Sequence, residues 1–290
     1  MRTRQMAGLG IAVAWGMAGA VSSARAQGSL TPPEAPGPTM RTLAQVEPRI
    51  PITNAPYTIT QPGSYYLTAN LSSSGHGIVI QSSRVTLDLM GYSLTGDRGG
   101  TDYGIWVNGS PGAALRDITV RGGIISGFGD GARFDDAQDS RMEGLTISSN
   151  SAYGVYFYGG GGACDGNTLR DCAISGNGSY GVYLYGWAGT CDGNTVAHCV
   201  LRENADRGLY VYYANGNRIE NNHVSGTTGA SSYGIQTSGS SANLILQNSC
   251  VGQAINYNIS ANDTYGPIVT SSGALATNGA AAHPWANFSR

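Results

Sequence analysis

Short runs in which hydrophobic and polar residues alternate recur along most of this chain. After Gly154, Gly181 and Gly208, apolar residues stand one and three positions further on, and aromatic or polar residues stand between them. Alternation with a period of two predicts a β-strand that buries one face. A second alternating run follows in each segment, as at Val196 and Leu201. Each segment therefore predicts two or three short strands.

The segments repeat at a nearly constant interval. Their anchoring glycines are separated by 27, 27, 23, 27, 27 and 26 residues, at Gly77, Gly104, Gly131, Gly154, Gly181, Gly208 and Gly234. A leucine-rich repeat of similar period needs a ladder of leucines that this chain lacks, and a propeller blade needs a period of about 40. The sequence therefore predicts an all-β protein, a single right-handed parallel β-helix of about seven to eight coils.

The turn phrases resemble those of a known superfamily. The same period separates four of them, which begin at Asn167, Asn194, Asn217 and Asn243. Together with the turn Asn or Cys that follows, they resemble the repeats of the pectin-lyase-like right-handed β-helices over residues 57–260. Residues 85–91 and both chain ends resemble a family of secreted bacterial β-helix repeat proteins. The resemblance implies the fold and names no activity, because the matching residues are core and turn positions.

The two ends of the chain lack the repeat. Arg2, Arg4, the apolar stretch Met6–Val21 and the small residues Ala24 and Ala26 predict a secretory signal. The apolar stretch is too short and too rich in Gly and Ala for a membrane anchor. A short helix from Thr39 to Glu47 is expected to cap the first coil. The predicted organisation is a signal peptide (1–26), a flexible leader (27–39), an N-terminal cap (40–56), the β-helix (57–265) and an irregular C-terminal tail (266–290).

The balance of charged residues argues against two classes of binding partner. All 16 basic residues are arginines, and the chain after residue 26 has 13 of them against 18 acidic residues, a net charge of −5. Because no basic stripe exists, nucleic acid and anionic membranes are not expected as partners. No later segment is long and apolar enough to span a bilayer. The expected location is secreted, on the cell surface or periplasmic.

The five cysteines follow the repeat. Cys164 and Cys191 lie 27 residues apart in two loops, each before an Asp-Gly-Asn phrase. Stacked coils place equivalent residues about 4.8 Å apart, within the Cα range of a disulfide, so we predict a Cys164–Cys191 bridge. Cys172 and Cys199 replace turn asparagines, and a reduced ladder is as compatible with this position as a second bridge. Cys250 takes an inward position and is predicted to be a buried free thiol. A zinc site is not expected, because no closely spaced Cys pairs occur.

Residues two and four positions after each glycine face outward in this register. On three adjacent coils these positions are all tyrosine: Tyr156, Tyr158, Tyr183, Tyr185, Tyr210 and Tyr212. Trp106, Arg133 and Asp135 stand on the coils beside them. Aromatic rings offer apolar faces to sugar C–H groups, and phenol hydroxyls bond sugar hydroxyls. We therefore expect six solvent-facing tyrosines and Trp106 to bind a polysaccharide. Two alternatives stay open: a ladder that only stabilises the sheet, and an interface with the tail or another copy.

Charged residues are densest between positions 130 and 143. The candidate catalytic residues in this segment are Arg133, Asp135, Asp136 and Asp139. Paired carboxylates near arginine can bind Ca²⁺ and a uronate, or act as acid and base. The alternative is a solvated turn cluster that keeps the protein soluble.

Motifs of two enzyme families are incomplete here. Polygalacturonases carry Asp-Asp, then Gly-His-Gly, then Arg-Ile-Lys. In this chain Asp135-Asp136 follows Gly75-His76-Gly77, and lysine is absent. Residues 131–137 loosely resemble the Tyr-Gly-Phe-Asp-Pro-His phrase of alginate C5-epimerases, but Ala137 stands where the catalytic histidine belongs.

Three functions therefore remain open. The first is a secreted β-helix that binds an extracellular polysaccharide through its tyrosines without catalysis. The second is a polysaccharide lyase or epimerase that uses Arg133 and Asp135 on a uronate polymer, with Ca²⁺ as the cofactor if it is a lyase. The third is a structural or adhesive surface protein that forms oligomers through the tyrosines. No other cofactor or metal is expected.

Overall fold

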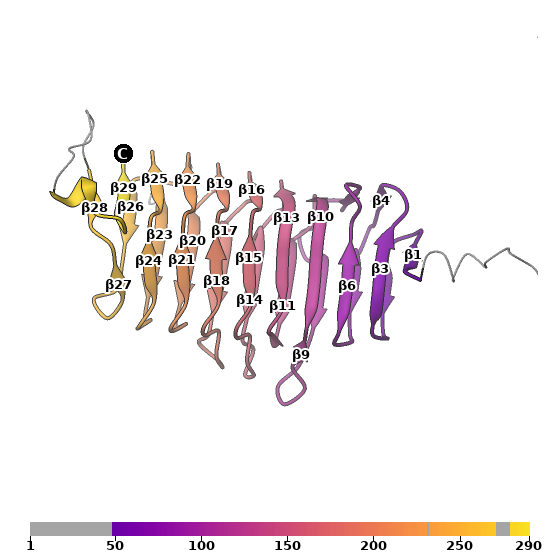
Figure 1. The fold of residues 1–290 in the computed structure, drawn as a ribbon. Coiled ribbons are helices and arrows are strands. Elements are labelled where there is room, and N and C mark those ends of the chain that lie inside the picture. The colour runs from indigo at the N-terminus through magenta and orange to yellow at the C-terminus, as the bar shows by residue number, and fades with distance from the viewer. Residues whose placement is uncertain (1–47, 231, 271–278) are drawn as a thin grey trace, which may run out of the picture. The chain divides into compact units, whose positions relative to one another are not determined.

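The described part of the chain forms a right-handed parallel β-helix (Figure 1). In the computed structural model these residues are 48–230, 232–270 and 279–290. The predicted signal, leader and capping helix at Thr39–Glu47 lie outside them. The described residues contain a single short 3₁₀-helix, η1 (Gly279–Ala282), and otherwise strands and turns. None of them forms a helix long and apolar enough to cross a membrane.

One side of the solenoid is a nine-stranded parallel sheet, called sheet B here. Each strand pairs with the equivalent strand of the next coil. The strands are β2 (Tyr57–Ile59), β5 (Ile78–Ile80), β8 (Tyr103–Asn108), β11 (Asp130–Asp135), β14 (Val155–Tyr158), β17 (Tyr180–Tyr185), β20 (Arg207–Tyr212), β23 (Tyr233–Ser238) and β26 (Ile255–Asn258).

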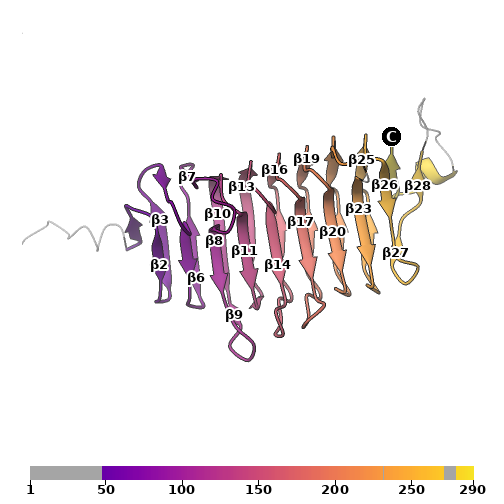
Figure 2. The same ribbon diagram turned by 180° about the vertical axis from the view of Figure 1, so that it is seen from behind.

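The other two rows of strands join into one sheet, because β10 and β13 each run through both rows. Figure 2 shows sheet B from the side opposite to Figure 1. The strands are β1 (Ile50–Ile52), β3 (Gly63–Leu67), β4 (Leu71–Ser72), β6 (Val85–Asp88), β7 (Ser93–Thr95), β10 (Ile118–Ser126), β13 (Arg141–Ser148), β15 (Thr168–Arg170), β16 (Ala173–Ser175), β18 (Thr195–Ala197), β19 (Val200–Arg202), β21 (Arg218–Glu220), β22 (His223–Ser225), β24 (Leu244–Leu246), β25 (Ser249–Val251), β27 (Thr264–Tyr265), β28 (Ile268–Val269) and β29 (Asn287–Ser289). Two further short strands, β9 (Leu115–Arg116) and β12 (Ala137–Gln138), pair with each other.

The core consists of inward side chains in register from coil to coil. Val155 pairs with Val182, which pairs with Leu209, and all three are fully buried. The alternation in the sequence therefore assigned the inward face correctly, since a shift by one residue would expose every one of these side chains.

The corners of the coils are held by buried asparagines. At one corner the Oδ1 of Asn194 accepts from the backbone N–H of Asn167 at 2.8 Å. The Oδ1 of Asn217 accepts from the backbone N–H of Asn194 at the same distance. The residue before each of them is a glycine with positive φ, such as Gly193 (φ 65°). Each buried amide thereby satisfies a backbone N–H of the preceding coil, which the turn alone would leave unpaired.

Part of the predicted C-terminal tail continues the solenoid. β29 pairs with β25 of the preceding coil and with β28. Residues 266–290 were expected to be irregular, but two short strands occur among those described. They add to the last coil, where an open sheet edge would otherwise remain.

Candidate functional site

The six predicted tyrosines lie in two columns on sheet B. Tyr156 pairs with Tyr183, which pairs with Tyr210, and the Tyr158 column is in the same register. Tyr156, Tyr183 and Tyr210 pack in an aromatic cluster separate from the solenoid core. The predicted register and outward direction are therefore both correct.

The structure adds a third column. Tyr153 and Tyr180 also pack against the cluster, and their rings stack with centroids 5.1 Å apart. Each stands directly before the repeat glycine, at the same 27-residue spacing as the other columns, so the period alone could have found them. We call these eight residues the tyrosine face: Tyr153, Tyr156, Tyr158, Tyr180, Tyr183, Tyr185, Tyr210 and Tyr212.

The middle column is less exposed than expected. Tyr156, Tyr183 and Tyr210 retain only 8%, 8% and 9% of their accessible surface. Their rings stack nearly parallel, 7° and 3° apart, with centroids 5.0 and 5.3 Å apart. The expectation that all six tyrosines lie open is therefore wrong for this column, because each ring covers the face of the next.

The outer column leaves more of each side chain accessible. Tyr158, Tyr185 and Tyr212 are half-buried, and their successive centroids are 5.4 and 5.7 Å apart. Within the described part of the chain, their hydroxyls have no hydrogen-bond partner. Burial raises the pKa of Tyr185 above its usual value, so the phenol stays neutral and keeps its proton to donate. This column therefore presents hydroxyl groups once per coil.

Trp187 extends this column and was missed by the sequence reasoning. It lies in the loop that follows β17 and is 57% exposed. Its ring stacks on Tyr212 with an interplanar angle of 17°, and it meets Tyr213 edge-on at 4.2 Å. The loop is hydrogen-bonded to the equivalent loop of the preceding coil, through Cys164 N–H to Thr190 O at 2.9 Å. Both loops project from the same side of the solenoid (Figure 1).

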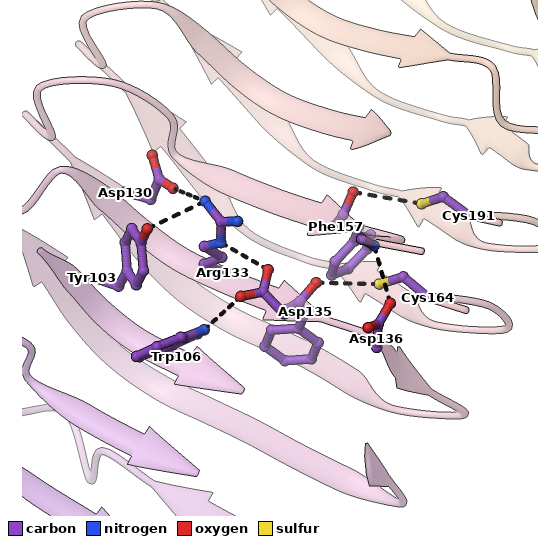
Figure 3. Close-up of polar contacts among 11 residues, drawn as sticks. Tyr103, Trp106, Asp130, Arg133, Asp135, Asp136, Phe157, Cys164 and Cys191 are labelled. Carbon is purple, nitrogen blue, oxygen red and sulfur yellow. Dashed lines mark hydrogen bonds and ion pairs between the residues drawn. The ribbon is translucent and has the colours of Figure 1, made fainter. Parts of the chain in front are cut away.

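Arg133 and Trp106 lie at the N-terminal border of the tyrosine face. Arg133 Nε donates to Asp135 Oδ1 at 2.7 Å, and Trp106 Nε1 donates to the other oxygen of Asp135 at 2.7 Å. Figure 3 shows the guanidinium between Asp135, Asp130 and the Tyr103 hydroxyl. The predicted Arg133–Asp135 proximity is thus present, as an internal ion pair.

The candidate carboxylates do not converge. Asp136 points away from Arg133 (Figure 3) and accepts from the N–H of Gly160 at 3.0 Å. Asp139 instead forms an exposed ion pair with Arg116 at 3.1 Å. Only Asp135 of the three lies on the outer surface of sheet B, so an acid and base pair is not assembled from them.

Asp130 is a buried carboxyl that we did not single out as a candidate. It accepts from the N–H of Tyr153 at 3.2 Å and lies 3.8 Å from Arg133. Burial raises its pKa to about 6. It stands in the column that precedes the glycines, which the sequence reasoning did not follow.

The cysteines occupy the positions expected from the repeat. Cys164 and Cys191 are buried thiols on adjacent coils that donate to the carbonyls of Phe134 and Phe157 (Figure 3). Burial raises the pKa of Cys191. The bridge between them stays a prediction.

Two further thiols, Cys172 and Cys199, lie at another corner. A hydrogen bond from Cys199 lowers the pKa of Cys172, and the same bond together with burial raises that of Cys199. Cys250 is fully buried at its predicted inward position.

The coil geometry and the three rows of strands define a right-handed parallel β-helix of the pectin-lyase-like class. Within that class, the chain belongs to the family described as periplasmic copper-binding protein (NosD), whose model matches residues 63–272. No curated protein matches the sequence.

Several solved structures share the fold. An alginate lyase from Paenibacillus sp. FPU-7 is 18% identical with a TM-score of 0.54, over 78% of this chain and 88% of the lyase. The Dettilon tailspike protein is 12% identical (TM-score 0.51) over 83% of this chain and 61% of its own. The enzymatically active domain of bacteriophage CBA120 tailspike protein 2 is 15% identical (TM-score 0.52) over 76% and 43%. At these identities the likeness concerns the fold alone.

Proposed function

We propose that this protein binds a polysaccharide along the tyrosine face, in the periplasm or outside the cell, without cleaving it. The observation that carries the proposal is the outer column of Tyr158, Tyr185 and Tyr212, which repeats one phenol on each of three successive coils. Coils of a parallel sheet are about 4.8 Å apart, close to the length of one sugar unit. A polymer lying along the solenoid axis would meet an equivalent hydroxyl at every unit.

The stacked rings determine how the polymer is contacted. Because ring faces in the middle column cover one another, a sugar meets ring edges and hydroxyls there, not open faces. Trp187 offers an accessible indole at the edge of the outer column, and indole faces pack against sugar C–H groups. The stack also holds the phenols rigid, so little side-chain entropy is lost on binding.

The charged groups support binding more than catalysis. Asp135 is held by Arg133 and Trp106, and Asp136 and Asp139 lie away from it. A lyase or epimerase needs a base beside the sugar carbon that loses its proton. No such base is identified among these candidates.

The family description names copper, whose ligands in proteins are mainly histidine and cysteine side chains. All four histidines and all five cysteines lie among the described residues. Within that part of the chain, His, Cys, Asp and Glu nowhere form a group of three that could hold a metal ion. Copper sites in proteins gather imidazole and sulfur ligands around one point. The residues present do not fit such a site, and the proposal includes no copper.

The proposal is tested by retention on a panel of immobilised polysaccharides, with the eluates analysed for unsaturated or epimerised products with and without Ca²⁺. We expect retention by at least one polymer, weaker retention of Trp187→Ala, and no product. Release of unsaturated products would favour the lyase alternative. Absence of retention, together with an oligomer in light scattering that Trp187→Ala disrupts, would favour the interface alternative.

A further inference from the structure

Arg133 borders the tyrosine face, and aromatic rings and a carboxylate surround its positive charge. Its guanidinium carbon lies within about 5 Å of three aromatic ring centroids, at 5.0 Å from Tyr103, 4.8 Å from Tyr156 and 4.8 Å from Tyr158. Its Nε is hydrogen-bonded to Asp135, and only 19% of its side chain is exposed. Cation–π contacts and the ion pair therefore occupy the groups that a bound anion would need.

Arg207 repeats this arrangement at the other border. Its guanidinium carbon lies 4.9 Å from the centroid of Tyr180, 4.6 Å from that of Tyr210 and 5.2 Å from that of Tyr233. It forms an ion pair with Asp206, donates to Gln236, and is 18% exposed. Both border arginines are thus neutralised by their own carboxylates.

The surface between them carries no charge. On the three coils that contain β14, β17 and β20, every position of the three outward columns other than Arg207 is a tyrosine. Burial raises the pKa of Tyr156 and Tyr183 far above the usual value, so these phenols do not ionise. The chain has a formal net charge of −2, which adds a weak repulsion of polyanions.

We infer that the polymer bound by the tyrosine face is an uncharged polysaccharide rather than a uronate polymer. The inference rests on the proposed function. A uronate carboxylate would have to displace Asp135 or Asp206 from its arginine and would leave a carboxylate unpaired at the surface. A neutral glycan needs only the hydroxyl and ring-edge contacts that the face offers. This inference replaces the expectation that Arg133 binds the carboxylate of a uronate polymer.

The test compares polymers with the same backbone and different charge. Polygalacturonate and its methyl ester, and alginate and its carboxyl-reduced form, are used with neutral glucans, mannans and galactans, each at low and high salt. We expect one or more neutral polymers to be retained at least about tenfold more strongly than any uronate. Retention should be unchanged by salt, because no counterions are released.

The Asp135→Asn variant sharpens this comparison. It keeps an oxygen for Trp106 and removes the closer of the two carboxylates beside Arg133, which leaves Asp130 at 3.8 Å. We therefore expect it to gain salt-sensitive retention on polygalacturonate that the wild type lacks. Salt-sensitive retention of the wild type on uronates alone, unchanged in Asp135→Asn, would overturn the inference and leave the proposed function standing. Failure of every polymer to retain the protein would remove both.

Discussion

At the scale of single residues, Tyr183 shows that a side chain can point out of the core and still be buried. The period-two alternation correctly places it outside the core, yet Tyr156 and Tyr210 cover both of its ring faces. Such coverage depends on which residues occupy the same position on the neighbouring coils. Because all three are tyrosines, the column behaves as a second, smaller apolar cluster.

Loss of this ring should cost stability. Aromatic pairs contribute about 0.5–1.5 kcal/mol each beyond the area they bury, so Tyr183→Ala, which removes two stacks, should lower the free energy of unfolding by at least about 1–3 kcal/mol. Tyr183→Phe keeps the ring and serves as the control. Urea unfolding measures both. Equal stability of Tyr183→Ala and the wild type would show that the stack contributes nothing.

Asp130 should make stability depend on pH in an unusual direction. An unfolded aspartate titrates near 3.9, whereas this one has a folded pKa of about 6. Between these values the folded protein holds a proton that the unfolded chain releases, so the contribution of Asp130 to stability falls as pH rises.

The Asp130→Asn variant lacks this titration. Relative to the wild type it should gain up to about 3 kcal/mol between pH values of about 4 and 7. Denaturant unfolding at a series of pH values gives the difference directly. A constant difference between the two proteins would mean that Asp130 titrates as an ordinary surface carboxyl.

At the scale of the strand, Gly181 shows why the repeat is anchored on glycine. A Cβ at this position would lie 2.6 Å from the carbonyl oxygen of Gly208 and 2.9 Å from a methyl group of Leu201. Neither the backbone of the next coil nor the packed core can move away freely. Gly181→Ala should therefore destabilise the protein by about 1–3 kcal/mol through overpacking. The control is Gly193→Ala, because nothing lies within 4 Å of the added carbon but φ at this position is +65°. This variant therefore measures the cost of backbone strain without a clash.

The corner ladder should be equally sensitive. Asn194 accepts from the backbone of Asn167, and its own amide donates to Asn217 at 3.1 Å. Asn194→Ala leaves the N–H of Asn167 buried without a partner, at a cost of about 1–3 kcal/mol. Thermal unfolding and amide exchange of Asn167 measure the loss. Retained slow exchange at Asn167 would show that another acceptor replaces the side chain.

The sequence predicted the strands better than the site, for a physical reason. Burial of one face requires an apolar residue at every second position of a strand and at the same position of each coil, as at Val155, Val182 and Leu209. Both regularities can be read from the sequence. The contacts of Arg133 and Trp187 depend on rotamers and loop paths, which no period specifies. The separation of Asp135, Asp136 and Asp139 was not visible either, because a turn between adjacent residues redirects their side chains.

At the scale of the whole molecule, the paired loops raise the question of covalent linkage between coils. A Cys164–Cys191 bridge would close a loop of 27 residues and in the chain-entropy account stabilise the fold by about 3–4 kcal/mol. Non-reducing peptide mapping of the oxidised protein should find this pair, and reductant should lower its melting temperature. A double Cys172→Ala, Cys199→Ala variant removes the competing pair. A Cys164–Cys172 linkage would show that the coil register is wrong.

The central claim concerns the hydroxyls of the outer tyrosine column, and one measurement tests it most directly. The triple variant Tyr158→Phe, Tyr185→Phe, Tyr212→Phe keeps every stacked ring and removes only the outward hydroxyls. Its retention in affinity electrophoresis through a gel containing the bound polysaccharide is compared with that of the wild type and of Tyr92→Phe, a tyrosine away from sheet B. We expect the triple variant to bind at least about tenfold more weakly, with unchanged unfolding and with Tyr92→Phe like the wild type. Unchanged retention of a folded triple variant would contradict the account.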